Sequence, residues 1–119
     1  MEREIRAGLD AWNRHDPDGC FAMCAEDCLL QVNNSRTRGR EVMREIARGY
    51  FDIYPDFQMV FSSVWVDGNT VVEEWRSTGT HVRTGRRFEL SGMGLDQFGE
   101  DGRVYRSAVY FDPATLAAR

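Results

Sequence analysis

The sequence contains no lysine and few cysteines, prolines or histidines. Its 119 residues include three Cys, three Pro and two His, and no apolar run approaches the ~18 residues that a membrane-spanning helix needs. The charged opening, Met-Glu-Arg-Glu, lacks the apolar centre of a signal peptide. We therefore expect a cytoplasmic protein with no membrane contact and no disulfide framework.

The three cysteines, Cys20, Cys24 and Cys28, are spaced by four residues. No second Cys or His cluster completes a zinc-binding set, so we expect no metal site. The three thiols are interpreted as small buried side chains.

The charge balance is acidic, because 15 basic residues, all Arg, face 19 Asp and Glu, for a net charge of −4. An acidic domain is a poor candidate for nucleic-acid binding. One local exception is the Arg-rich stretch between Arg36 and Arg48, where Glu41 and Glu45 interleave the arginines at helical spacing. This stretch predicts a solvated helix face, with an anion or partner site as the alternative.

The first half of the chain has helical patterns, and its length suits one domain covering residues 1–119. Apolar residues recur every three or four positions in 2–14, as in an amphipathic helix. Asp16-Pro17 resembles a helix start, and a short second helix would carry Phe21, Met23, Cys24 and perhaps Cys20. We expect a strand at 28–32, a loop at 33–39, and a third helix at 41–51. Its inward residues would be Val42, Met43, Ile46, Ala47 and Tyr50.

The second half has strand patterns separated by short turns. The expected strands are 57–66, 70–81, 87–98 and 103–111, followed by a helix start at Asp112-Pro113. Consecutive strands with short turns form an antiparallel meander. The predicted fold is α+β, with three N-terminal helices packed on a curved antiparallel sheet that forms a cone with an internal pocket.

Seven short motifs occur in the order found in a known family. They are Trp12–Asp18, Ala25–Cys28, Gly39–Glu41, Tyr54–Asp56, Gly79–His81, Asp101–Val104 and Tyr110–Asp112. In this order they resemble the SnoaL-like polyketide cyclases, within the superfamily of nuclear transport factor 2, ketosteroid isomerase and limonene-epoxide hydrolase. The resemblance implies a cone-shaped fold, often a homodimer through the sheet, with an apolar pocket for a polyketide-, steroid- or terpenoid-like ligand.

The chemistry implied by the resemblance is proton transfer by a carboxyl group, yet the usual acids are missing. The oxyanion-hole Tyr and Asp and the base of ketosteroid isomerase fall near Gly8, Gly94 and Val32. A one-residue shift in the 99–102 hairpin would exchange Gly94 for Leu95. The strand Asp of the cyclases and of limonene-epoxide hydrolase falls at Val109.

The remaining two hydrolase partners, an Arg and an Asp, fall at Trp75 and Ser77. If these two side chains face the pocket, strand alternation turns Glu73 inward too. A Glu among apolar walls would have a raised pKa and could act as a base. The alternative is a structural Glu73 at the rim or paired with Arg83 or Arg106.

Two more residues are candidates for catalysis. Asp96 would project inward if its strand has the register of ketosteroid isomerase, and is otherwise an exposed residue near a hairpin. His81 titrates in a useful range but stands at a strand end. The last strand would turn one set of residues inward: Tyr105, Ser107, Val109 and Phe111.

The predicted ligand contacts are mostly aromatic or apolar: Trp12, Asn33, Tyr50, Tyr54, Trp75, Ser77, Val109 and Phe111. Trp12, Tyr50 and Tyr54 could equally be core, and Asn33 could simply form a turn.

Two functions remain open from the sequence. The first is an isomerase, cyclase or epoxide hydrolase acting on a small hydrophobic compound. The second is a non-catalytic small-molecule-binding or dimerisation protein. No cofactor motif occurs, so we expect none.

Overall fold

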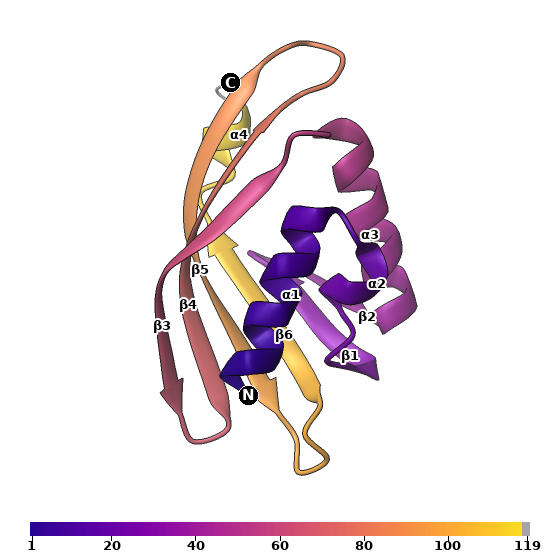
Figure 1. Ribbon diagram of the computed structural model, residues 1–119, viewed down its shortest axis with the longest axis vertical. Coiled ribbons are helices and arrows are strands. Elements are labelled where there is room, and N and C mark those ends of the chain that lie inside the picture. The colour runs from indigo at the N-terminus through magenta and orange to yellow at the C-terminus, as the bar shows by residue number, and fades with distance from the viewer. Residues whose placement is uncertain (118–119) are drawn as a thin grey trace.

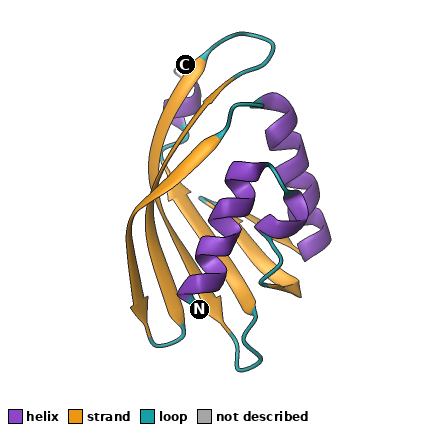
Figure 2. Ribbon diagram, viewed as in Figure 1, coloured by secondary structure: helices purple, strands orange, loops and turns teal. Residues whose placement is uncertain are grey.

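The computed structural model describes residues 1–117 as a curved sheet with helices on one face (Figures 1 and 2). The helices are α1 (Glu2–Arg14), α2 (Pro17–Cys20), α3 (Arg40–Ile53) and α4 (Ala114–Ala117). The strands are β1 (Cys24–Val32), β2 (Ser35–Arg38), β3 (Gln58–Asp67), β4 (Thr70–Thr80), β5 (Arg87–Phe98) and β6 (Val104–Phe111). None of the helices described is long and apolar enough to cross a membrane.

The sheet has the strand order β2-β1-β6-β5-β4-β3. Strands β3 to β6 form the predicted antiparallel meander, and the α+β fold class is confirmed. The pairing of β1 with β6 differs from the expectation, because these strands run parallel and make the sheet mixed. No hairpin joins β1 to β6, so local turn chemistry does not fix their relative direction.

The predicted loop at 33–39 contains a strand instead. Strand β2 pairs with β1 through a two-residue turn in which Val32 faces Ser35. Asn33 has a φ of 52° at this turn, a conformation that Asn tolerates better than most residues. The polar residues of this segment predicted a loop, although the segment forms a short edge strand.

The helical predictions need two corrections. Helix α2 ends at Cys20, so Phe21 and Met23 lie in a turn and Cys24 begins β1. On α3, Met43 and Ala47 are buried as expected, and Ile46, although 45% exposed, lines the space between helix and sheet, whereas Val42 is 47% exposed and does not. Met43, Ala47 and Phe51 form one stripe at a spacing of four residues, and the two exposed residues lie beside that stripe.

A bulge changes the inner face of β6. The pairing advances from Gln97–Arg106 directly to Phe98–Val104, so Tyr105 has no partner on β5. Tyr105 was predicted to face inward, but it is 46% exposed. A β-bulge inserts one extra residue and reverses the alternation beyond it, so Val104 takes the buried position.

Trp12 ties the helices to the sheet through an aromatic cluster. Its ring lies 5.4 Å from that of Phe51 and 5.7 Å from that of Phe57, centroid to centroid. Phe21 and Tyr50 meet the same indole edge-on. These contacts fix α1 and α3 above the concave face and leave space between helices and sheet.

Candidate functional site

A cavity of roughly 270 Å³ lies between the helices and the inner face of the sheet. Its walls are apolar side chains from α1, α3 and five strands, and the few polar groups lie on the sheet. The lining residues on the sheet side include Leu30, Val32, Met59, Phe61, Glu73, Trp75, Ser77, Leu90, Gly94, Asp96, Ser107 and Val109. The volume is at the lower end of the range for small-molecule pockets, about 300–1,000 Å³.

Glu73 and Asp96 meet on the inner face of adjacent strands. Glu73 on β4 faces Gly94 on β5, so Asp96, two residues further along β5, is its diagonal neighbour on the same face. Residues in this arrangement are within reach of long side chains. Glu73 is 5% exposed and Asp96 7%, so both carboxyl groups are buried at the cavity wall.

Burial raises the pKa of both carboxyl groups, and the contact between them moves the two pKa values in opposite directions. Desolvation, then the hydrogen bond and charge of Asp96, raise the pKa of Glu73 to about 10. Desolvation also raises the pKa of Asp96, although hydrogen bonds from Glu73 and Ser107 oppose this shift. These pKa shifts assign the shared proton to Glu73, which donates a hydrogen bond to Asp96. The Ser107 hydroxyl also donates a hydrogen bond to Asp96.

Glu73 Oε2 is buried and has no hydrogen-bond partner among the groups described. Such an orphan oxygen is costly unless a proton or ligand satisfies it. In the free protein this oxygen has no hydrogen-bond partner among the described groups.

The alternative of a structural Glu73 paired with arginine is wrong. Arg106 Nη1 donates to Gln97 Oε1 at 3.2 Å, and both residues face away from the cavity. Arg83 is exposed in the turn after β4. The cavity wall therefore holds two adjacent acids without a balancing arginine.

Several predicted contact residues lie at the cavity. Trp12, Tyr50, Trp75, Ser77 and Val109 all line it. Burial raises the pKa of Tyr50 to about 12, which keeps its hydroxyl protonated. Their roles toward a ligand stay predictions.

Three predicted contact residues lie outside the lining. Asn33 Oδ1 accepts from the Phe111 backbone N–H at 2.9 Å and so joins the β1–β2 turn to β6. Phe111 packs edge-on against Trp75 and supports the wall from behind. Tyr54 packs between Phe88 and Tyr50 in the core.

His81 is also outside the lining, at the end of β4. Its Nδ1 accepts from the backbone N–H groups of Arg83 and Thr84, at 3.1 and 3.3 Å. The ring thus holds the turn between β4 and β5. The structure places His81 in this turn and not among the residues that line the cavity with the two acids, and its catalytic role stays a prediction.

The positions at which the resemblance places catalytic residues of related enzymes lie around the cavity. Gly8, Val32, Gly94 and Val109 all contribute to its lining. An added Cβ on Gly94 would lie 3.8 Å from Glu73 Oε1, an ordinary contact distance, so a small side chain could stand beside the carboxyl group here. The chain carries its acids at other positions of the same pocket.

The cysteines are buried and unpaired, as predicted. Cys20 and Cys24 lie at the cavity, and burial raises the pKa of Cys20 to about 12, which makes its thiol a weak nucleophile at neutral pH. Within residues 1–117 no group of three His, Cys, Asp or Glu side chains is arranged to hold a metal ion.

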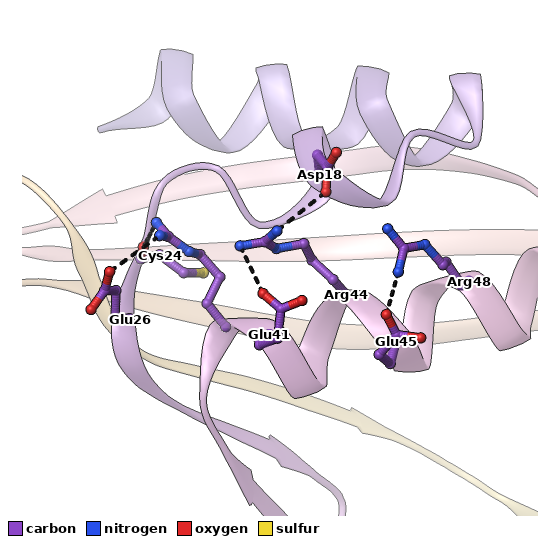
Figure 3. A network of polar contacts seen from close by, with 8 residues as sticks. Asp18, Cys24, Glu26, Glu41, Arg44, Glu45 and Arg48 are labelled. Atoms are coloured by element: carbon purple, nitrogen blue, oxygen red, sulfur yellow. Dashed lines mark hydrogen bonds and ion pairs between the residues drawn. The ribbon is translucent and has the colours of Figure 1, made fainter.

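The Arg-rich stretch forms ion pairs on the surface (Figure 3). Arg44 lies 3.4 Å from Asp18 and 3.2 Å from Glu41, and Arg48 pairs with Glu45. Arg40 donates to the Cys24 carbonyl oxygen. These contacts agree with the solvated-face interpretation.

Helices packed on a curved mixed sheet define an α+β fold of the nuclear transport factor 2-like class. The profile of the SnoaL-like domain matches residues 5–107, and the chain belongs to this family. No curated protein matches the chain.

Solved structures share the fold at low identity. AclR from Streptomyces galilaeus, a proposed hydroxylase, has a TM-score of 0.86 at 20% identity over 99% of this chain and 92% of its own. An LEH-like epoxide hydrolase from M. tuberculosis has a TM-score of 0.81 at 22% identity, over 98% and 85%. A proposed SnoaL-like polyketide cyclase from Jannaschia sp. CCS1 has 0.83 at 16%, over 98% and 90%. Likeness at this level concerns the fold alone.

Sequence reasoning found Glu73 and Asp96 separately but missed their pairing and the contact with Ser107. The signal was present, because the partners across β4 and β5 follow from the turn at 81–86 that joins these strands. Counting back from Thr80–Arg87 places Glu73 opposite Gly94 and next to Asp96. Ser107 faces Asp96 only through the bulged pairing of β5 and β6, which the sequence does not signal.

Proposed function

We propose that the chain is an enzyme performing proton-transfer chemistry, of the isomerase, cyclase or epoxide-hydrolase type, on a compact apolar compound. The observation that carries this proposal is the pair of buried carboxyl groups, Glu73 and Asp96, at the wall of an apolar cavity. Carboxyl groups with raised pKa values are suited to give and take protons near neutral pH. Membership of a family that includes cyclases supports the proposal.

Glu73 and Asp96 together could take one proton from the substrate and donate another to it. Asp96, as the carboxylate, takes a proton from a carbon next to a carbonyl group or from a water molecule that attacks an epoxide. Glu73, as the acid, donates a hydrogen bond or a proton to the oxygen on which negative charge develops. The apolar walls exclude water and so strengthen both interactions.

The test is a ligand screen followed by a turnover assay. The panel holds terpenoid epoxides, polyketide ketones and steroids, with the smaller compounds first because the cavity is small. Binding at 100 times the dissociation constant would stabilise the fold by roughly 2.7 kcal/mol, which a thermal-shift measurement detects. Compounds that bind are then assayed for conversion.

Glu73→Gln is the decisive variant, and Glu74→Gln is its matched control. Glu74 is the next residue on β4, faces the opposite side of the sheet and is exposed. Conversion should stop with Glu73→Gln and continue with Glu74→Gln. Conversion that survives Glu73→Gln would refute the proposed role of the pair.

A second candidate is a small-molecule-binding protein without catalysis. It is favoured by the residues Gly8, Val32, Gly94 and Val109, which cannot serve as acid or base at the positions where the resemblance places catalytic groups of related enzymes. This function predicts binding without conversion of any bound compound.

We also propose a homodimer through the outer face of the sheet. Trp65, Met93 and Tyr110 are exposed there, on the side opposite the cavity. Sedimentation should give the mass of a dimer for the native chain and of a monomer for Met93→Glu. A monomeric native chain would refute this assembly.

A further inference from the structure

The cavity contains acidic groups without a basic partner. Among its lining residues, which all lie in the described part of the chain, Glu73 and Asp96 have carboxyl groups and none is Arg, Lys or His. The pKa of each acid responds to burial, to the other acid and to hydrogen bonds, and to no neighbouring cation. Buried acids are ordinarily paired with a positive group.

A second observation shows that this wall is incomplete. Only 5% of Glu73 is exposed, yet its Oε2 meets no donor among the described groups of the protein. Asp96 has the Ser107 hydroxyl beside it, whereas the Glu73 carboxyl group has a hydrogen bond from its own backbone and no hydroxyl donor of this kind. A ligand that brings an N–H group would satisfy this oxygen.

The aromatic part of the lining suits a positive group that carries an apolar body. Trp12, Tyr50, Phe57, Phe61 and Trp75 line the same cavity. Aromatic rings attract cations through their quadrupoles, and most strongly where water is excluded. Aromatic walls with acids at one side are the combination found in sites for ammonium ligands.

We propose that the natural ligand of this cavity carries a basic nitrogen, and that its protonated amine lies against Glu73 and Asp96. The ligand class is therefore an apolar amine. A carboxylate or phosphate ester would meet the two acids without compensation and be rejected.

The inference rests on the proposed function for the cavity and adds the charge of the substrate. A bound ammonium group balances the charge of Asp96 and so keeps it the carboxylate that the proposed function uses as base, while Glu73 remains the acid. No further co-reactant is needed, because binding forms hydrogen bonds and an ion pair only.

Three probes of one shape test the inference: 2-naphthylmethylamine, 2-naphthylmethanol and 2-naphthoate. Their affinities for the full chain are measured by titration calorimetry at pH 7. Because a hydrogen bond to a charged group is worth more than a neutral one, the amine should bind about tenfold or more tightly than the alcohol. The carboxylate should bind more weakly than both.

Variants identify the groups responsible. Asp96→Asn and Glu73→Gln should each reduce the preference for amine over alcohol, while Glu74→Gln should keep it. Circular dichroism confirms that each variant is folded. Asp96→Asn removes the negative charge and Glu73→Gln removes the neighbouring carboxyl group, so one misfolded variant still leaves the other to decide.

An alcohol that binds as tightly as the amine, an amine that does not bind, or a preference that survives both substitutions would overturn the inference. The proposed function is judged separately, by conversion of the neutral panel and its loss in Glu73→Gln. If the protein converts neutral compounds and shows no preference for the amine, the proposed function stands and the inference of an amine ligand fails.

Discussion

Charged residues are arranged in opposite ways at the cavity wall and on the outer surface of α3. On α3 each acid shown in Figure 3 has an arginine beside it, as Glu41 has Arg44 and Glu45 has Arg48, and the carboxyl groups are exposed. At the wall, Glu73 and Asp96 are buried and have only each other and Ser107. Exposed pairs contribute about 0–1 kcal/mol, whereas an unbalanced buried pair costs stability. An arrangement that costs stability is expected where it serves function.

The largest expected effect is on catalysis. Because Glu73 is assigned as the acid, Glu73→Gln should lower kcat by about 10²–10⁴-fold, the usual contribution of general acid–base catalysis. Once the ligand screen supplies a substrate, steady-state kinetics measures this effect. Glu41→Gln, on α3, is expected to leave kcat unchanged. Equal losses of kcat in both variants would show that the buried pair is no more important for catalysis than the ion pairs on α3.

The second effect is on stability against pH. The pKa of Glu73 is raised to about 10 in the folded chain, from 4.5, so between these values the folded state holds a proton that the unfolded state has lost. The free energy of unfolding should therefore fall as pH rises, by about 1.4 kcal/mol per pH unit for one such group. Urea unfolding between pH 5.5 and 8.5 measures the slope.

The matched variants separate the contributions to this slope. Glu73→Gln should flatten it, because glutamine has no proton to lose. Glu41→Gln should leave it as in the native chain. A native slope near zero would contradict the raised pKa.

The third effect concerns the space in front of the acids. An added Cβ on Gly92 would lie 2.4 Å from Trp75 Cζ2 and from the Tyr110 carbonyl oxygen, whereas on Gly94 it would find ordinary contact distances. Gly92→Ala should therefore cost about 1–3 kcal/mol by overpacking. Gly94→Ala should be better tolerated, and the two variants are compared by urea unfolding.

The fourth effect is on the protonation of the pair. The Ser107 hydrogen bond holds the pKa of Asp96 below the value that burial alone would give. Ser107→Ala should raise this pKa further, because the carboxylate loses the hydroxyl that donates to it. Carbon-13 NMR of the side-chain carboxyl groups follows the titration, and an unchanged titration would exclude the contact.

The smallest effect is expected on α3. Arg44→Gln removes a partner of Asp18 and Glu41 at the surface, and should change the free energy of unfolding by less than about 1 kcal/mol. High salt should shrink the difference further by screening. A larger loss that salt does not reduce would show that the surface network matters as much as the buried pair.

The sequence by itself determined the class of fold and many of its elements. Strand β5 has the predicted bounds, because alternating apolar residues end at glycine-containing turns. The inward direction of Glu73 followed from the same alternation. These features depend on local periodicity and turn chemistry, which a sequence displays directly.

Only the tertiary structure decided how the site is assembled. The parallel contact of β1 with β6, the bulge that turns Tyr105 outward and the meeting of Asp96 with Ser107 all depend on packing between distant segments. Burial decided the chemistry as well, because the raised pKa of Glu73 results from desolvation and a neighbouring acid. A residue's type is written in the chain, but its solvation and its neighbours exist only once the chain has folded.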